Sequence, residues 1–142
     1  MAAPRIAPLE PHEVDAAYAM ARLGYPELSL AGWRRLARHI LRCGPGRSGA
    51  LTARDGAGRL NGMLIYAVDP ALNGPPALRV EKLIAFDMMD AGLVAEALVA
   101  RALTLGRAQG CDAIALRRPL SPSAETTALI VESGAGALHQ VL

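Results

Sequence analysis

The chain has 142 residues, of which 52% are hydrophobic and 20% are charged. This size and composition fit one domain over residues 1–142 and exclude global disorder, because there is enough apolar surface to build a core. The formal net charge of +2 and the aromatic content of 4% argue against a nucleic-acid partner, which would need a strong basic field or a set of stacking rings.

Targeting signals are the next feature that the sequence can test. The segment from Met1 to Pro8 has no apolar run long enough for a signal peptide, and no stretch of the chain approaches the length of a membrane-spanning helix. Cys43 and Cys111 do not form a CxxC pair and lie beside expected core segments, so we interpret both as buried reduced thiols. These features predict a cytoplasmic protein with no membrane partner.

The first half of the chain predicts a strand, two helices and a hairpin. Residues 6–9 suit a short edge strand, because prolines interrupt this region. Residues 10–23 and 29–42 carry apolar side chains at helical spacing, and a glycine follows each run. Residues 49–54 and 60–68 are apolar segments joined by an Asp-Gly turn, which is typical of a hairpin.

The second half predicts a strand–helix–strand unit, then a helix and a last strand. Residues 78–86 form the first strand, and residues 91–109 form a helix so apolar that it must be largely buried. Strict alternation would divide the first strand into one face with Leu78, Val80, Lys82, Ile84 and Phe86 and another with Glu81, Leu83 and Ala85. We expect a strand at 112–117, a helix at 123–133 and a strand at 137–142.

This order of elements predicts an α/β fold with a mixed, mainly antiparallel sheet and helices on both faces. It resembles the order in the Gcn5-related N-acetyltransferase (GNAT) superfamily. Residues 97–116 are similar to the central helix of that superfamily, its Arg-x-x-Gly-Cys turn and its next strand, and residues 123–134 are similar to the following helix. The resemblance implies an acyl-CoA-dependent N-acyltransferase whose acceptor is a small-molecule or peptide amine.

The resemblance also implies where acetyl-CoA or another acyl-CoA would bind. The superfamily has a Gln/Arg-x-x-Gly-x-Gly/Ala segment before its central helix, whereas residues 90–95 here read Asp-Ala-Gly-Leu-Val-Ala. Asp90 stands where a cation or amide is expected, and a carboxylate there would repel a pyrophosphate by about 1–4 kcal/mol at 4 Å. The expected cofactor-binding residues are Ile84, Ala85, Phe86, Gly92, Leu93, Val94 and Ala95.

Glu81 is the candidate catalytic residue, because the resemblance implies a proton acceptor on this strand. The alternative is an exposed carboxylate that pairs with Arg79 or Lys82. The tyrosine that protonates the leaving thiolate in many superfamily members aligns near Ile130 or Glu132, so that acid is missing. These departures favour an alternative function, a catalytically silent GNAT-like module that binds a ligand or a protein partner.

The remaining candidates are a basic face and a pair of metal-ligand types. The expected second helix places four basic residues on one broad face, namely Arg34, Arg35, Arg38 and Arg42. They indicate either a surface that recognises an anion or a solvent-exposed face whose positive charges interact favourably with the C-terminal end of the helix dipole. His39 and Cys43 are four residues apart, but no third ligand follows from spacing, so no metal site is predicted. An exposed terminal strand would allow a homodimer.

Overall fold

The computed structural model of the protein describes residues 3–87 and 91–116, and the backbone of residues 128–132 and 138–141. Its elements in chain order are β1 (Arg5–Pro8), the 3-10 helix η1 (Pro11–Glu13), α1 (Tyr18–Gly24), α2 (Leu30–Cys43), β2 (Ser48–Arg54), β3 (Leu60–Asp69), β4 (Ala77–Phe86), α3 (Ala91–Ala108), β5 (Ala113–Leu116), β6 (Ala128–Glu132) and β7 (Leu138–Val141).

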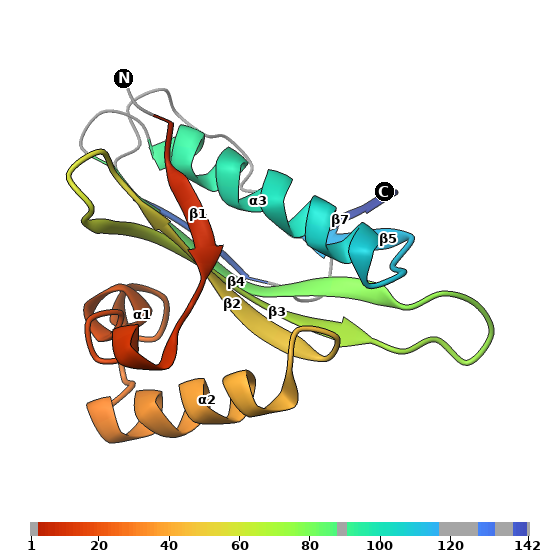
Figure 1. Ribbon diagram of the computed structural model, residues 1–142, viewed down its shortest axis with the longest axis horizontal. Coiled ribbons are helices and arrows are strands. Elements are labelled where there is room, and N and C mark those ends of the chain that lie inside the picture. The colour runs from red at the N-terminus through yellow and green to blue at the C-terminus, as the bar shows by residue number, and fades with distance from the viewer. Residues whose placement is uncertain (1–2, 88–90, 117–127, 133–137, 142) are drawn as a thin grey trace.

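The strands form one sheet in the order β1-β2-β3-β4-β5-β7, and β6 also pairs with β4. The β4–β5 pair is parallel and the other pairs are antiparallel, which confirms the predicted mixed sheet. β1 lies at the edge of the sheet, as the prolines predict. Figure 1 shows α1 and α2 on one face and α3 on the other, so helices cover both faces as expected.

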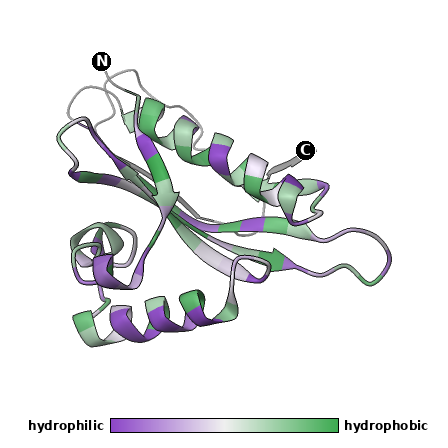
Figure 2. Ribbon diagram, viewed as in Figure 1, coloured by the Kyte–Doolittle hydropathy of each residue, from purple (hydrophilic) through white to green (hydrophobic). Residues whose placement is uncertain are grey.

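Each face of the sheet has its own hydrophobic core. Leu51, Leu64 and Leu98 belong to the core under α3, and Trp33 and Met63 belong to the core under α1 and α2. Figure 2 shows α3 hydrophobic along most of its length, whereas hydrophilic and hydrophobic residues alternate along α2. The pattern agrees with a deeply packed α3 and an amphipathic α2. No helix in the described ranges is long and apolar enough to span a membrane.

Local sequence signals mark the ends of several elements. The Ser29 hydroxyl accepts the Gly32 N–H at 3.0 Å and caps α2 as predicted. Gly110 ends α3 with φ +79°, and the next residue, Cys111, donates its N–H to the Gly106 carbonyl at 2.8 Å. The Asp55 carboxylate accepts two backbone N–H groups in the β2–β3 turn, which confirms the predicted hairpin.

The helix predicted over residues 10–23 is wrong in its first half. Residues 11–17 form η1 and a series of turns, and α1 begins at Tyr18. The Val14 carbonyl accepts the indole N–H of Trp33 at 2.6 Å, and the Tyr18 N–H donates to Asp15 with the spacing of a 3-10 helix. A tertiary contact from α2 therefore takes a carbonyl that a continuous helix would use.

The helix predicted over residues 123–133 is wrong over residues 128–132, which form β6 and pair antiparallel with β4. The other positions of that prediction lie outside the described residues. Ile130 and Val131 are β-branched and favour extended backbone. The edge of β4 beyond Arg79 is not paired with β5, so this edge can accept another strand.

The predicted alternation along β4 is wrong because the strand contains a β-bulge. Glu81 is an extra residue opposite the step between Ile65 and Tyr66 of β3, and a bulge reverses which face the following residues occupy. Lys82 and Ile84 therefore lie on the side of α1. Buried on the side of α3 are Leu78, Val80, Leu83 and Ala85.

Candidate functional site

The candidate site lies where β4 changes its neighbour. β5 pairs in parallel with residues 77–79, β6 pairs antiparallel with residues 82–86, and the Glu81 bulge lies between the two segments. The carboxyl end of β4 lies against the core that contains the start of α3. In open α/β sheets, ligands bind at the carboxyl ends of strands where the strand connections change direction. The position of β4 in the sheet therefore identifies its carboxyl end as a candidate ligand-binding site.

Glu81 stands at the bulge with its side chain 39% exposed. Its Oε1 accepts a hydrogen bond from Arg79 Nη1 at 2.5 Å, and Arg79 Nε donates to Asp69 Oδ2 at 2.8 Å. The hydrogen bond to Asp69 and the further bond to Glu81 outweigh the effect of burial and raise the pKa of Arg79. Glu81 is thus a partly exposed carboxylate held beside a fixed cation, as its non-catalytic alternative predicts.

Lys82 follows the bulge and has an environment that the sequence did not reveal. It is the single lysine of the chain, it is 6% exposed, and its Nζ lies 4.5 Å from the centre of the Tyr25 ring. A cation over a ring face gains electrostatic stabilisation that grows as water is excluded. The site therefore contains a buried cation on the α1 side, at the residue that follows Glu81.

Asn61 is a second polar residue that sequence reasoning missed. It is the extra residue of a bulge in β3 opposite β2, and it is 6% exposed. Its Nδ2 donates to Asp87 Oδ2 at 3.5 Å, and its Oδ1 is buried without a partner among the described residues. A buried amide oxygen without a partner is a hydrogen-bond acceptor for a donor that enters this end of the sheet.

The structure brings the expected cofactor-binding segments together at the same end of the sheet. The core under α3 contains Ala85, Val94 and Ala95. Ile84 is buried on the opposite face, whereas Phe86 and Leu93 are 44% and 48% exposed. The first turn of α3 contains Gly92 and carries no acidic side chain. Asp90 lies outside the described residues.

Other combinations of reactive side chains are accounted for by local structure. His39 Nε2 lies 3.8 Å from Cys43 Sγ, and burial raises the pKa of the Cys111 thiol, which lowers its reactivity. Within the described ranges, one group of three metal-ligand types comes together, at Glu10, His12 and Glu13. The two glutamates of that group form the capping box of η1, so their geometry is explained without an ion.

Comparison with known proteins gives matches in structure alone. No protein-family model and no curated protein matches the chain. Aminoglycoside antibiotic 6'-N-acetyltransferase AAC(6')-Ih from Acinetobacter baumannii matches with a TM-score of 0.69 and 16% identity, over 83% of this chain and 81% of that chain. Glucosamine-6-phosphate N-acetyltransferase from Arabidopsis thaliana matches with a TM-score of 0.68 and 13% identity, over 82% and 83%. Aminoglycoside N-acetyltransferase AAC(6')-Iy in complex with CoA matches with a TM-score of 0.66 and 16% identity, over 76% and 72%.

This chain has the GNAT fold. The resemblance that the sequence indicates is therefore correct for the architecture. The low identities carry no information on substrate or activity.

One of the matched structures is a complex with CoA, and the described residues of this chain would fit an acyl-CoA donor only in part. The N–H groups in the first turn of a helix attract phosphate, and the first turn of α3 has a glycine and no acidic side chain. The backbone edge of Ile84 to Phe86 is paired with β6, with Ile84 opposite Ile130 and Phe86 opposite Ala128. A donor does not fit along this edge while β6 is paired with β4.

Proposed function

We propose that this chain is an acyl-CoA-dependent N-acyltransferase whose acceptor is an amine on a small molecule or peptide. The GNAT fold supports the proposal, since the matched structures are named as N-acetyltransferases and one is a complex with CoA. The observation that carries it is the bulge at Glu81, which places a partly exposed carboxylate where β4 leaves β5.

Glu81 is the residue we propose as proton acceptor. An alkyl amine is an ammonium ion near neutral pH and must lose a proton before its nitrogen can act as a nucleophile. Arg79 holds the Glu81 carboxylate in place at the bulge by a charge-assisted hydrogen bond. The proton passes to Glu81 directly or through a water molecule.

Lys82 assists this step by its charge. Its buried ammonium follows the bulge residue, and a positive charge close to an acceptor amine disfavours the protonated form of that amine. Tyr25 keeps the ammonium on the α1 side of the sheet. We therefore propose that the acceptor approaches from the α1 side and reaches the bulge between Glu81 and Lys82.

A second candidate function is a catalytically silent module that keeps the GNAT fold and binds a ligand or a protein. The pairing of β6 with residues 82–86 favours it, because β6 fills the edge that an acyl donor would need. The acyltransferase proposal requires β6 to separate from β4 when the donor binds. The two candidates therefore differ in whether acetyl-CoA binds and reacts.

The test is a transfer assay with acetyl-CoA and a panel of amines: an aminoglycoside, an amino sugar, a polyamine and a peptide with a free amino terminus. Release of the CoA thiol and the mass of the acylated amine are measured for wild type, Glu81→Gln and Asp69→Asn. Loss of a general base lowers the rate by about 100-fold or more, so Glu81→Gln should show this fall in kcat/KM. Asp69→Asn is the control. Like Glu81→Gln, it removes a carboxylate that accepts from Arg79, but it leaves Glu81 unchanged and should keep near-normal activity.

Two results of that assay would contradict the proposal. Absence of an acylated amine with every acceptor would favour the silent module. Equal kcat/KM for Glu81→Gln and wild type would remove Glu81 from the proton transfer. Circular dichroism of each variant establishes that it is folded before its rate is compared.

A further inference from the structure

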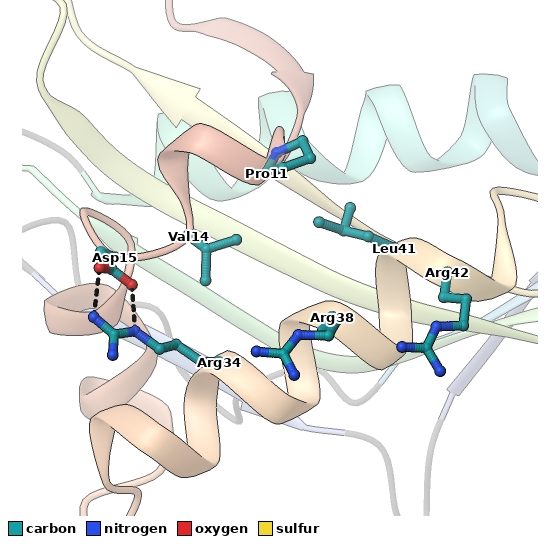
Figure 3. A pocket seen from close by; sticks show the side chains of 7 residues that line it. All are labelled: Pro11, Val14, Asp15, Arg34, Arg38, Leu41 and Arg42. Carbon is teal, nitrogen blue, oxygen red and sulfur yellow. Dashed lines mark hydrogen bonds and ion pairs between the residues drawn. The ribbon is translucent and has the colours of Figure 1, made fainter.

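A groove of about 460 Å³ lies between α2 and the segment that runs from η1 to Asp15. Neither β4 nor α3 contributes to its lining, so the groove is separate from the site at Glu81. Small-molecule sites have volumes of roughly 300–1,000 Å³, and this volume falls in that range. Figure 3 shows the groove with the side chains that line it.

One end of the groove is closed by an ion pair whose charges cancel. Arg34 Nε donates to Asp15 Oδ1 at 2.8 Å, and Arg34 Nη2 donates to Asp15 Oδ2 at 2.7 Å. The hydrogen bond from Arg34 lowers the pKa of Asp15, so the carboxylate stays ionised. This two-point contact links α2 to the turn after η1 and orients the first guanidinium of the row.

Arg38 and Arg42 continue the row along α2 without a compensating charge. They are four residues apart, so they project from successive turns on the same side of the helix, as Figure 3 shows. Neither forms an ion pair with any residue in the described part of the chain. The groove therefore presents two uncompensated positive charges.

Helix stability does not account for this arrangement. Cations favour the carboxyl end of a helix, but the effect is confined to about the last turn. α2 ends at Cys43, so Arg42 lies in the last turn and Arg38 lies more than one turn earlier. The favourable interaction with the helix end explains Arg42 alone, and the row of guanidinium groups beside a groove needs another explanation.

Apart from the ion pair and the two arginines, the lining of the groove is apolar. Val14 and Leu41 are half-buried and line it from the turn after η1 and from α2, and Pro11 extends the same apolar surface. Contact with these side chains favours a ligand that has an apolar part, because that part leaves water on binding. The groove thus combines an apolar wall with a cationic rim.

We propose that this groove binds a phosphate monoester with an apolar body. A phosphate monoester carries a charge of about −1.5 to −2 at pH 7, which balances two guanidinium groups, whereas a single carboxylate would balance one. Guanidinium groups also match phosphate oxygens with paired N–H donors. The apolar body lies against Val14 and Leu41. This inference does not depend on acyl transfer at Glu81.

The experiment is a calorimetric titration of phenyl phosphate, inorganic phosphate and benzoate into the full chain. Phenyl phosphate should bind most tightly, because inorganic phosphate lacks the apolar body and benzoate lacks the second charge. The double variant Arg38→Gln/Arg42→Gln should bind phenyl phosphate at least about tenfold more weakly, since it loses two charge-assisted contacts. Arg35→Gln is the matched control, because Arg35 is an exposed arginine of α2 outside the groove lining, and should keep wild-type affinity.

Each other outcome overturns a stated part of the proposal. No binding of phenyl phosphate at millimolar concentration, or equal affinity in the double variant and Arg35→Gln, removes the site. Equal affinity for phenyl phosphate and inorganic phosphate removes the apolar contact, and equal affinity for benzoate removes the requirement for a dianion. Arg38 and Arg42 are exposed, so the variants should unfold at the wild-type temperature. If the double variant does not fold, the two single variants replace it.

Discussion

Glu13 and Arg54 form the ion pair that connects η1 to β2. Arg54 Nη2 donates to Glu13 Oε2, and Glu13 Oε1 accepts the Glu10 N–H at 3.1 Å. Burial by itself raises the pKa of Glu13, but the hydrogen bonds from Arg54 and from the Glu10 backbone outweigh this effect and hold the pKa below its ordinary value of 4.5. Folding therefore favours the ionised carboxylate of Glu13.

A pKa that is lower in the folded state makes stability depend on pH. The contribution of Glu13 is fully present above its ordinary pKa of 4.5 and is lost as pH falls through the lower folded-state value. In urea titrations, wild type should exceed Glu13→Gln in unfolding free energy at pH 7, and the difference should shrink toward pH 3. Glu27→Gln, which removes an exposed carboxylate without an ion pair in the described part of the chain, is the control. A difference that stays constant with pH would contradict this account.

The site residues differ in how far the sequence could identify them. Glu81 and the segments near Phe86 and Leu93 follow from a resemblance that depends on residue order along the chain. Lys82 and Asn61 matter because of what surrounds them, and those neighbours come from other parts of the chain: Tyr25 lies over Lys82, and Asp87 lies beside Asn61. Burial and a tertiary partner leave no local pattern in the sequence.

At the scale of elements, α3 lies very close to β3. Gly62 allows this approach, since a Cβ built there would lie 2.8 Å from Val94 Cγ1 and 3.0 Å from Leu98 Cδ1. Val94 and Leu98 are fully buried, so neither side chain has free space to move into. The absence of a side chain at Gly62 therefore sets how near the long helix lies to the sheet.

Gly62→Ala should lower the free energy of unfolding by about 1–3 kcal/mol, the usual cost of inserting a methyl group into a packed core. The matched control is Gly46→Ala, where the nearest atom to a new Cβ is the end of the flexible Gln109 side chain at 3.1 Å. The control should change stability by less than about 0.5 kcal/mol. Chemical denaturation measures both, and equal midpoints for the two variants would refute the close-packing explanation.

The β4–β6 pair is the element contact on which the acyl-donor question depends. Leu83 is opposite Val131 and Ile84 is opposite Ile130. Alternate residues of an antiparallel strand donate their N–H groups to the same neighbour, so one of Ile130 and Val131 donates toward β4 and the other does not. Proline lacks the N–H group, and substitution at the donating position weakens this pairing directly.

If β6 competes with the donor, one of Ile130→Pro and Val131→Pro should bind acetyl-CoA several-fold more tightly than wild type, and the other should change less. Hydrogen exchange at residues 82–86 identifies which variant has lost the pairing, and calorimetry measures the affinity. Affinity that is unchanged or weaker in the variant with exposed β4 amides would show that β6 does not compete with the donor.

Local signals predicted where several elements end, whereas contacts between distant segments decided the elements that were predicted wrongly. Ser29 and Gly110 act within one turn of their own helices, and both were identified correctly. The bulge at Glu81 is invisible in the pattern of β4, because β4 is buried on both faces and apolar residues occur on each side. The sequence of β6 suits a strand only where a neighbour offers an edge, and β4 supplies it.

At the scale of the whole molecule, the fold separates two surfaces that have different chemistry. The proposed acyltransferase site is at the Glu81 bulge of β4, whereas the row of arginines lines a groove along α2 to which neither β4 nor α3 contributes (Figures 1 and 3). Acyl transfer at the first and phosphate binding at the second are independent proposals. Homodimerisation through an edge strand stays a prediction; β1 and β7 are the outer strands of the main sheet.

Titration of acetyl-CoA into the wild-type chain, by calorimetry and by thermal unfolding, tests the acyltransferase proposal most directly. A ligand that binds only the folded state raises its stability by about 2.7 kcal/mol at a concentration of 100 Kd. We predict saturable binding and a melting temperature that rises with acetyl-CoA concentration. No heat of binding and an unchanged melting temperature at millimolar acetyl-CoA would contradict the proposal and leave the silent module as the function of this fold.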